Sequence, residues 1–290
     1  MRKPLRNLGA SVRARLLTLA KTRNEPFDLL LTRYVIERFL YRLSVSKHRD
    51  RFVLKGAMLI ATWFDDPHRP TRDVDLLGFG EPDPALILAA FSDICAVPAE
   101  DAVTFDIKNL AADRVRDEAE YQGLRVKTNA LVDGARVRLV VDIGFGDAVE
   151  AGFDSIEMPV LLDLPPPRLR AYPREAVIAE KFHAMVILGL ANSRMKDLYD
   201  VWLLTQSHEF KSDRLSKAIA ATFARRNTAI PTEPPDSLTH TFATDPSKMR
   251  QWVAFIEDVA VKPGSLASVV DDLVTFLMPY ASEAHKIRDD

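Results

Sequence analysis

The segment TRDVDLL, residues 71–77, places two carboxylates two positions apart among apolar residues. Successive side chains of a β-strand point to opposite faces of the sheet. Asp73 and Asp75 would therefore share one face, with their α-carbons roughly 6.5–7 Å apart. Val74 and Leu76 would face the other way, into a core. Two carboxylates held this close repel each other unless a cation lies between them, so the pattern predicts a strand that presents an acidic pair to a bound cation.

A third carboxylate, Asp142, lies inside the apolar segment LVVDIGF. If its strand lies beside the first, three carboxylates meet, enough to hold two Mg²⁺ ions. Magnesium prefers oxygen ligands and commonly bridges carboxylates and substrate phosphates. Two metal ions can clamp the attacking and leaving oxygens of a displacement at phosphorus. The alternative is that Asp142 only caps the end of its strand, beside the turn glycines Gly144 and Gly146.

Two further features suit an anionic ligand. Lys55, Gly56 and Ala57 form a glycine turn followed by a small residue at the start of a predicted helix. Such a helix start exposes backbone N–H groups and the positive end of the helix dipole, which together form a phosphate seat. Lys181 lies among apolar residues of another predicted helix, and burying a lysine without an anionic partner is costly. A nucleoside triphosphate would supply that partner.

The segment NSRMKDLYDVW, residues 192–202, gathers four charged residues on one predicted helix. Arg194 and Asp197 are three positions apart, and Lys196 and Asp200 are four apart, so each pair can form an ordinary helix salt bridge. Such pairs contribute only a few tenths of a kcal/mol each. The segment is therefore consistent with a solvated helix as well as with a functional cluster.

The spacing of apolar residues predicts the elements that must position these side chains. Asp133 and Gly134 separate two alternating segments, which predicts a β-hairpin over 123–145 with a type I′ turn. Ser193 is a candidate N-cap, and 227–246 is predicted to be a loop. The predicted helices cover about 10–22, 27–43, 57–64, 84–96, 174–190, 194–206, 212–225, 248–260 and 265–279.

The stretch Pro165-Pro166-Pro167 stops regular structure and indicates a linker. We therefore expect a first domain over 1–164, in which strands and helices form a mixed sheet, and a helical domain over 165–290. The fold class expected from this order is α+β.

The composition says more about the cellular compartment of the protein than about its binding partners. The chain has 290 residues, of which 28% are charged, and a net charge of −2. Its single cysteine, Cys95, lies in an apolar segment and cannot form an internal disulfide, so a reducing cytoplasm is expected. No run of 18 apolar residues occurs, so no membrane span is expected. Residues 166–226 hold eleven Lys/Arg against six acids, which indicates either an anionic partner or simply a solvated face.

The sequence lacks the motifs of several other classes of functional site. The segments GFGEP and GFGDA do not supply the G-x-G-x-x-G of a dinucleotide site. There is no P-loop and no serine hydrolase elbow, and the six histidines show no zinc-ligand spacing. His183 is expected to be packed inside the protein rather than catalytic.

Taken together, LKGA, TRDVDL, AEKFHA and NSRMKDLYD resemble the AbiEii/AbiGii-type nucleotidyltransferase toxins, which include the mycobacterial MenAT toxins of type IV toxin–antitoxin systems. The resemblance covers about residues 50–205. It implies a DNA polymerase β-like nucleotidyltransferase fold with a mixed sheet, followed by a helical half that completes the active site. It also implies transfer of a nucleotide from an NTP to the 3′ end of tRNA, which blocks aminoacylation and translation, and an antitoxin protein that silences the activity.

Carried onto this sequence, the resemblance implies that Asp73 and Asp75 bind the metal. Lys181 would hold triphosphate oxygens, and Asp197 would be the catalytic acidic residue of the C-terminal motif. Asp142 would be the third carboxylate of the wider superfamily, and its role relative to that of Asp200 stays open.

The same resemblance implies a set of residues that bind the nucleotide. Ala57 departs from the glycine or serine that is commoner at its position and lacks a possible hydroxyl contact. Thr71 supplies the hydroxyl two positions before Asp73, for phosphate contact or inhibitory modification. The nucleotide-binding set is Lys55, Gly56, Ala57, Thr71, Arg194 and Lys196.

The favoured hypothesis is a Mg²⁺-dependent nucleotidyltransferase that acts on tRNA. The basic N-terminal segment and residues 166–226 would contact the RNA backbone. A second hypothesis is transfer of a nucleotidyl or phosphoryl group to a protein or small molecule. A third is a non-catalytic nucleotide-binding partner of a regulator, against which the retention of Asp73, Asp75 and Lys181 argues.

Overall fold

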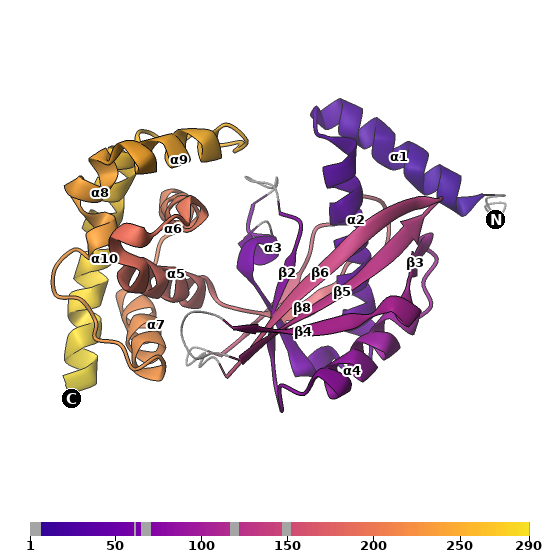
Figure 1. The fold of residues 1–290 in the computed structure, drawn as a ribbon, viewed down its shortest axis with the longest axis horizontal. Helices are drawn as coiled ribbons and strands as arrows, with labels where there is room; N and C mark the ends of the chain where they lie inside the picture. The colour runs from indigo at the N-terminus through magenta and orange to yellow at the C-terminus, as the bar shows by residue number, and fades with distance from the viewer. Residues whose placement is uncertain (1–6, 61, 65–70, 117–121, 147–151, 290) are drawn as a thin grey trace. The chain divides into compact units, whose positions relative to one another are not determined.

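The computed structural model describes residues 7–60, 62–64, 71–116, 122–146 and 152–289. The chain forms two compact units, which Figure 1 shows. The first contains the β-sheet and ends at Ala171, and the second is helical and starts its main stretch at Tyr172. The predicted α+β class, with a mixed sheet followed by a helical C-terminal half, is confirmed.

The sheet of the first unit has eight strands in the order β3-β5-β6-β2-β1-β8-β7, with β4 pairing alongside β5. The pairs β2–β6 and β1–β8 are parallel, and the other pairs are antiparallel. The strands are β1 (Phe52–Lys55), β2 (Val74–Gly78), β3 (Val103–Phe105), β4 (Ala111–Arg116), β5 (Gln122–Val132), β6 (Ala135–Phe145), β7 (Asp154–Glu157) and β8 (Arg168–Ala171).

The long hairpin β5–β6 forms as predicted. Asp133 and Gly134 at its turn have φ of 47° and 79°, and positive φ at both central residues is the requirement of a type I′ turn. Val132 pairs with Ala135 directly beside the turn, and the register continues outward to Leu124. The turn therefore fixes which residues of the two strands face each other.

The two faces of the sheet differ in polarity. Leu54, Leu76 and Ile143 are paired neighbours across β1, β2 and β6, and all three are buried. One position further along, Asp75 and Asp142 are also paired neighbours, and they point to the opposite, partly exposed face. A one-residue slip of either strand would turn the carboxylate of that strand into the core, so the apolar side of the sheet fixes the positions of Asp75 and Asp142.

The helices of the first unit pack around this sheet. Helix α2 contacts β6 and β8, and α4 contacts α2, β3 and β4 (Figure 1). Helix α4 begins at Pro84, where the side chain of Asp83 accepts a hydrogen bond from the backbone N–H of Leu86, an N-cap. The helices are α1 (Leu8–Arg23), α2 (Phe27–Val45), α3 (Gly56–Ile60) and α4 (Pro84–Ala96).

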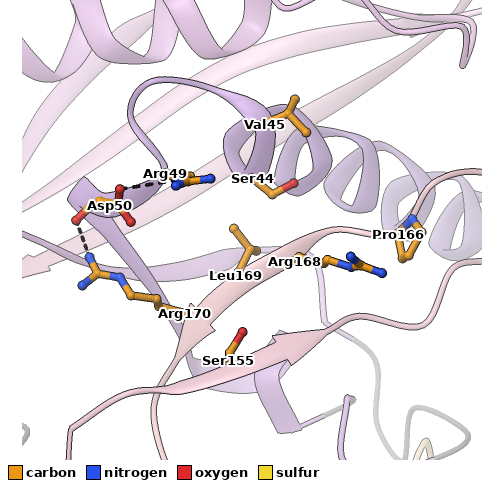
Figure 2. Close-up of a pocket in the computed structure, with 9 residues that line it drawn as sticks. All are labelled: Ser44, Val45, Arg49, Asp50, Ser155, Pro166, Arg168, Leu169 and Arg170. Carbon is orange, nitrogen blue, oxygen red and sulfur yellow. Dashed lines mark hydrogen bonds and ion pairs between the residues drawn. The ribbon is translucent and has the colours of Figure 1, made fainter.

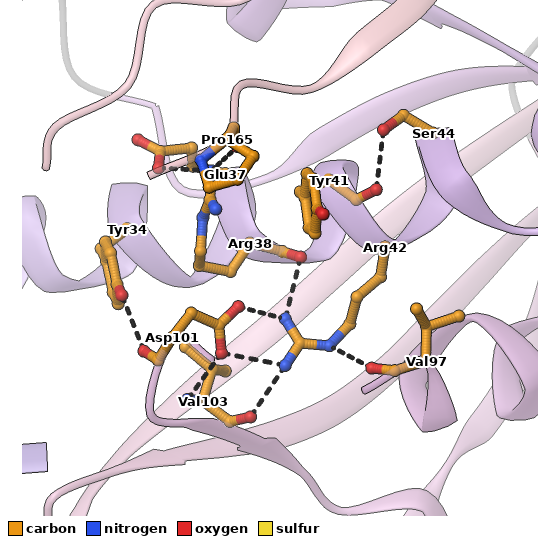
Figure 3. Close-up of polar contacts among 10 residues, drawn as sticks. All are labelled: Tyr34, Glu37, Arg38, Tyr41, Arg42, Ser44, Val97, Asp101, Val103 and Pro165. Carbon is orange, nitrogen blue, oxygen red and sulfur yellow. Dashed lines mark hydrogen bonds and ion pairs between the residues drawn. The ribbon is translucent and has the colours of Figure 1, made fainter. Parts of the chain in front are cut away.

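A buried ion pair ties α2 to the segment that connects α4 with β3. The guanidinium of Arg42 pairs with both carboxylate oxygens of Asp101, at 2.6 and 3.0 Å (Figure 3). Its other N–H groups bond the backbone oxygens of Arg38, Val97 and Val103. All five donors of Arg42 are thereby satisfied, which is the condition under which a buried charge is tolerated.

Cys95 is buried in α4, as predicted. Burial raises the pKa of its thiol to about 12, so almost none of it is thiolate, the form that reacts. We expect the native protein to react with Ellman's reagent at pH 8 only as fast as it unfolds, and to react fully in guanidinium chloride. Rapid and complete labelling of the native protein would contradict the buried position.

The second unit is built from helices. Helix α10 contacts α6, α7 and α8 and runs along the unit in Figure 1. Among the described residues, no helix is both long and apolar enough to span a membrane. The helices are α5 (Arg174–Leu188), α6 (Met195–Ser207), α7 (Ser212–Arg225), α8 (His240–Thr244), α9 (Pro246–Ile256) and α10 (Leu266–Asp289).

Some elements differ from the predicted ones. Strand β8 follows the three prolines and pairs with β1 and β7, so the first compact unit includes it. Helix α6 has Arg194 rather than Ser193 as its N-cap residue. The short helix α8 lies in the predicted loop. Helix α10 continues past Pro279, which is exposed, and the buried residues Leu277 and Ala281 lie on either side of it.

Candidate active site

Paired residues on β1, β2, β6 and β5 form a row of charges on the partly exposed face of the sheet. Lys55 pairs with Asp75, Asp75 pairs with Asp142, and Asp142 pairs with Arg125. Directly paired residues project to the same face of a sheet. The row therefore places two carboxylates side by side at its centre and a cation at each end.

Asp73 adds a third carboxylate just before β2 begins. The hydroxyl of Thr71 donates a hydrogen bond of 3.0 Å to Asp73 Oδ1 and thereby fixes that side chain. The pKa of Arg125 is raised, first by its hydrogen bonds to Asp142 and also by the negative charges of Asp73 and Asp75. The carboxylates of Asp73, Asp75 and Asp142 therefore all lie close enough to Arg125 to affect its pKa.

Asp142 already has a cationic partner. Arg125 holds it with two hydrogen bonds, Nε to Oδ1 at 2.7 Å and Nη2 to Oδ2 at 2.8 Å. This fork geometry is the strong form of an arginine–carboxylate pair. Arg125 was not among the predicted site residues, and the structure adds it. A metal-binding role for Asp142 stays a prediction and would require this pair to open.

The described residues contain no group of three His, Cys, Asp or Glu arranged to hold a metal ion. Magnesium, however, is usually bound through one or two carboxylates together with substrate phosphates and water, rather than by a complete cage of protein ligands. Asp73 and Asp75, with the backbone turn at Gly56 beside them, fit that kind of site. The donors present are thus consistent with a metal ion that is completed by its substrate.

Gly56 makes the close approach to Asp75 possible. Its φ is +73°, and a Cβ atom at this position would lie 1.9 Å from Asp75 Oδ2. Both the backbone conformation and the available space therefore require glycine here. Lys55 and Ala57 lie on either side, at the end of β1 and in the first turn of α3. Binding of phosphate by these three residues stays a prediction.

Replacing Gly56 with alanine should reduce stability beyond the cost of backbone strain alone. Gly80 provides a matched control, because it also has positive φ, +96°, but a Cβ added there would have nothing within 4 Å. We expect Gly56→Ala to lower the free energy of unfolding by about 1–3 kcal/mol more than Gly80→Ala does, a typical cost of overpacking. Urea unfolding of both variants measures the difference. Equal losses would show that the close approach to Asp75 is unimportant.

The second unit holds a buried cluster of ion pairs. Lys181 Nζ on α5 lies 2.6 Å from Asp197 Oδ1 and 2.9 Å from Asp200 Oδ2, both on α6. The side chains of the two aspartates are 1% exposed, and that of Lys181 is 11% exposed. The anionic partner predicted for Lys181 is thus present within the unit itself, in the form of carboxylates.

Arg194 extends this cluster, with Nε 2.6 Å from Asp197 Oδ2, so the predicted helix pair with Asp197 is formed. The other helix pair that the spacing allowed, Lys196 with Asp200, does not form. The side chain of Lys196 is exposed, whereas Asp200 is buried and pairs with Lys181. Asp200 therefore belongs to the cluster although it was not among the predicted catalytic residues.

His183 is packed, as expected, and not part of either cluster. Arg226 Nη1 lies 3.1 Å from its Nδ1, and Thr228 Oγ1 lies 2.9 Å from its Nε2. An arginine can only donate, so Nδ1 accepts and Nε2 carries the proton. Burial, and then the charge of Arg226, lower the pKa of His183 to about 4.

This pKa predicts loss of stability in acid. Between pH 6.5 and about 4 the unfolded state binds a proton at His183 that the native state does not, so stability falls as the pH falls through this range. The contribution is on the order of 2–3 kcal/mol. Urea unfolding at pH 7 and pH 4.5 should show a smaller difference for His183→Gln than for the wild type. His240→Gln, at an exposed position, should keep the wild-type difference. Identical pH dependence in all three proteins would contradict a neutral His183.

A comparison with protein families identifies the family of the chain. The model of the family described as "Nucleotidyl transferase AbiEii toxin, Type IV TA system" matches residues 38–274. The chain belongs to the AbiEii family. The matched range contains both charged clusters, from Lys55 to Asp200. The AbiEii family consists of nucleotidyl transferase toxins, as the resemblance of the sequence motifs indicated.

Two solved structures are similar to this AbiEii chain at low sequence identity. One is described as "putative nucleotidyltransferase from H. pylori", with 15% identity, a TM-score of 0.47, and coverage of 89% of this chain and 94% of that one. The other is JHP933 from Helicobacter pylori, with 16% identity, a TM-score of 0.47, and coverage of 89% and 92%. No curated protein matches the chain in sequence.

Proposed function

We propose that this AbiEii protein transfers a nucleotide from an NTP to the 3′ hydroxyl of tRNA in a Mg²⁺-dependent reaction that blocks aminoacylation and translation. The observation that carries the proposal is the acidic pair Asp73 and Asp75, with Gly56 against Asp75, on the partly exposed face of the sheet. Membership of a nucleotidyl transferase family supports the reaction type. The tRNA acceptor and the metal are inferred from the resemblance of the motifs.

In the proposed reaction the acceptor hydroxyl loses its proton and its oxygen bonds the α-phosphorus of the NTP. The bond from that phosphorus to the oxygen of the β-phosphate breaks, and pyrophosphate leaves. When bound, Mg²⁺ would neutralise the phosphate oxygens and lower the pKa of the attacking hydroxyl. Asp73 and Asp75 would hold it, and the hydrogen bond from Thr71 keeps Asp73 oriented for this task.

The chain contributes mainly position and charge. The turn at Lys55, Gly56 and Ala57 would bind phosphate oxygens through its backbone N–H groups. Asp142 would serve as a third metal ligand only if its pair with Arg125 opened, and while the pair is closed Arg125 neutralises the charge of Asp142. This arrangement prevents a third negative charge from opposing the entry of a triphosphate, since nearby like charges repel.

The helical unit would contribute cations for the triphosphate. Lys181 would bind its oxygens, with Arg194 and Lys196 in support. Asp197 holds both Lys181 and Arg194 at 2.6 Å, so it would orient the cations as well as act as the catalytic carboxylate implied by the family motif. Ligand phosphates would replace part of the carboxylate contacts that these cations make in the structure.

The partners follow from the same family. A type IV toxin has an antitoxin, and a nucleotidyl transferase takes an NTP as its substrate. We therefore expect NTP, tRNA and a cognate antitoxin protein as partners, in the cytoplasm.

A labelling experiment tests the proposal. The purified protein is incubated with Mg²⁺ or EDTA, total tRNA and each labelled NTP in turn, beside Asp73→Ala and the surface control Asp113→Ala. Label on tRNA that requires Mg²⁺ and is lost only in Asp73→Ala is the expected result. Label on a protein would instead support a different acceptor. No label with any acceptor would overturn the assignment as an enzyme.

A further inference from the structure

The first unit contains a cavity of about 330 Å³ at the other end of the sheet order from β5 and β6. It lies among the C-terminal end of α2, the 3₁₀ turn η1 (Arg49–Arg51) and strands β7 and β8 (Figure 2). Its polar lining consists of three arginines, two serines and one aspartate. These are Arg49, Arg168, Arg170, Ser44, Ser155 and Asp50.

One of the three arginines is fixed. Arg170 donates from Nη2 to the backbone oxygen of Asp50 (Figure 2), and its guanidinium lies over the ring of Phe79 at 5.3 Å from the centroid. An arginine stacked on an aromatic ring keeps its orientation. Arg170 therefore provides a positioned positive charge at one end of the cavity.

The other two arginines can turn toward a ligand at small cost. Arg168 is 77% exposed and pairs with Glu157 at 2.7 Å. Arg49 is 66% exposed, and its Nε lies 3.5 Å from the carboxylate of the adjacent Asp50. Exposed ion pairs of this kind contribute about 0–1 kcal/mol. A singly or doubly charged anion that engages both guanidiniums would offset the loss of these pairs.

The lining selects a compact anion. Three guanidiniums against Asp50 in the lining and Glu157 beside Arg168 leave one positive charge in excess, and guanidinium forks match phosphate oxygens in two-point contacts. The hydroxyls of Ser44 and Ser155 can donate to the same oxygens. Among the described residues that line the cavity, none is aromatic, so they offer no platform on which a nucleobase could stack. The chemistry therefore fits a phosphate group rather than a whole nucleoside.

The cavity is separate from the acidic pair but close enough to serve the same substrate. Strand β8 is two places from β2 in the sheet order, with β1 between them. Because neighbouring strands lie about 4.8 Å apart, β8 is roughly 10 Å from β2 across the sheet. The register of β1 with β2 and β8 also sets Arg170 and Arg168 two and four residues along the strands from the level of Asp75, roughly a further 7–13 Å. An RNA strand whose 3′ end reached the acidic pair would have backbone phosphates at distances of this order.

We propose that this arginine-lined cavity is a phosphate-binding site and that, on the basis of the proposed function, it holds a backbone phosphate of the acceptor RNA. The acidic pair would then act on the end of a strand that the cavity positions. The phosphate could come from an RNA strand or from a small molecule, and the experiment distinguishes these two sources.

The test measures binding in EDTA and without NTP, so that it does not depend on catalysis. Fluorescence anisotropy follows a labelled single-stranded RNA dodecamer, with inorganic phosphate as competitor. The double variant Arg49→Ala/Arg168→Ala is compared with Arg136→Ala/Arg138→Ala, which removes the same charge from exposed positions on β6. Thermal unfolding confirms that both variants are folded.

We expect the cavity variant to bind RNA at least tenfold more weakly, and the control to change less than threefold. The log–log salt slope should fall by roughly 0.7 for each phosphate of the single strand that the variant no longer neutralises. Glu157→Gln, which frees Arg168, should bind RNA several-fold more tightly. Equal weakening in both double variants would overturn the proposal, since only total charge would then matter.

The remaining outcomes distinguish an RNA phosphate from a small-molecule phosphate, and the phosphate site from the proposed enzymatic function. If inorganic phosphate binds the wild type but not the cavity variant, while RNA binding is the same in both, the site is one for a small phosphate and the RNA assignment fails. If RNA binds through the cavity but no acceptor is ever labelled by an NTP, the phosphate site stands and the proposed enzymatic function fails.

Discussion

Replacing Asp75 with asparagine is expected to abolish nucleotidyl transfer while the fold remains intact. Asparagine has nearly the same shape, so it fits against Gly56 as Asp75 does. It lacks the negative charge that the proposed metal site needs. Loss of a group that stabilises the transition state by charge typically costs 10²–10³-fold, and loss of a metal ligand should cost at least roughly 10³-fold. The rate of label incorporation into tRNA measures this effect.

A matched control separates this role from general charge. Asp113 on β4 pairs with Arg125 in the sheet register and so lies on the same face, but its carboxylate is exposed and bonds Lys127 at 2.6 Å. Asp113→Asn removes the same charge at the outer end of the row and should keep at least half of the wild-type rate. Similar rates for the two variants, whether both high or both low, would contradict a specific role for Asp75.

Much of the acidic site follows from local rules in the sequence. The spacing of Asp73 and Asp75 places them on one face, and the apolar neighbours Val74 and Leu76 fix which face that is. The turn at Asp133 and Gly134 also fixes the hairpin register. Counting outward from that turn pairs Arg125 with Asp142, so the sequence already contained the information that Asp142 has an arginine partner.

The position of Asp142 beside Asp75 could not be derived in this way. Their strands β2 and β6 are parallel neighbours, but α4, β3, β4 and β5 lie between them in the chain. Parallel pairing of distant segments has no local signal, because it depends on how the whole sheet is assembled. The sequence could only state what would follow if the two strands were adjacent, and the structure shows that they are.

The helical cluster illustrates a choice between two plausible pairings. Spacing alone allows Lys196 to pair with Asp200 as readily as Arg194 pairs with Asp197. The decisive fact is the buried face of α6, on which Asp197, Asp200 and Val201 all lie. Lys196 lies on the exposed side. Positions i, i+3 and i+4 share a helix face, so the apolar pattern could have indicated that Asp200 points inward, but its partner on α5 required the structure.

Replacing Lys181 with methionine is expected to destabilise the protein by about 3–5 kcal/mol, the usual cost of removing one partner from a buried ion pair. Methionine matches the length of the lysine stem but leaves Asp197 and Asp200, both buried, without the charge that lies within 3 Å of each. Guanidinium chloride unfolding measures the loss. A change below about 1 kcal/mol would show that the cluster is more hydrated than its burial indicates.

A second substitution separates this structural role from the proposed catalytic one. Asp200→Asn in the Lys181→Met background removes the charge of the carboxylate that depended on Lys181, while Arg194 still holds Asp197. We expect this double variant to recover a large part of the lost stability, because the remaining charges are balanced. It should nevertheless transfer no measurable label to tRNA, since the cation proposed to bind the triphosphate is absent. A double variant that is both stable and active would show that Lys181 only supports the fold, and that the cations for the triphosphate come from elsewhere in the chain.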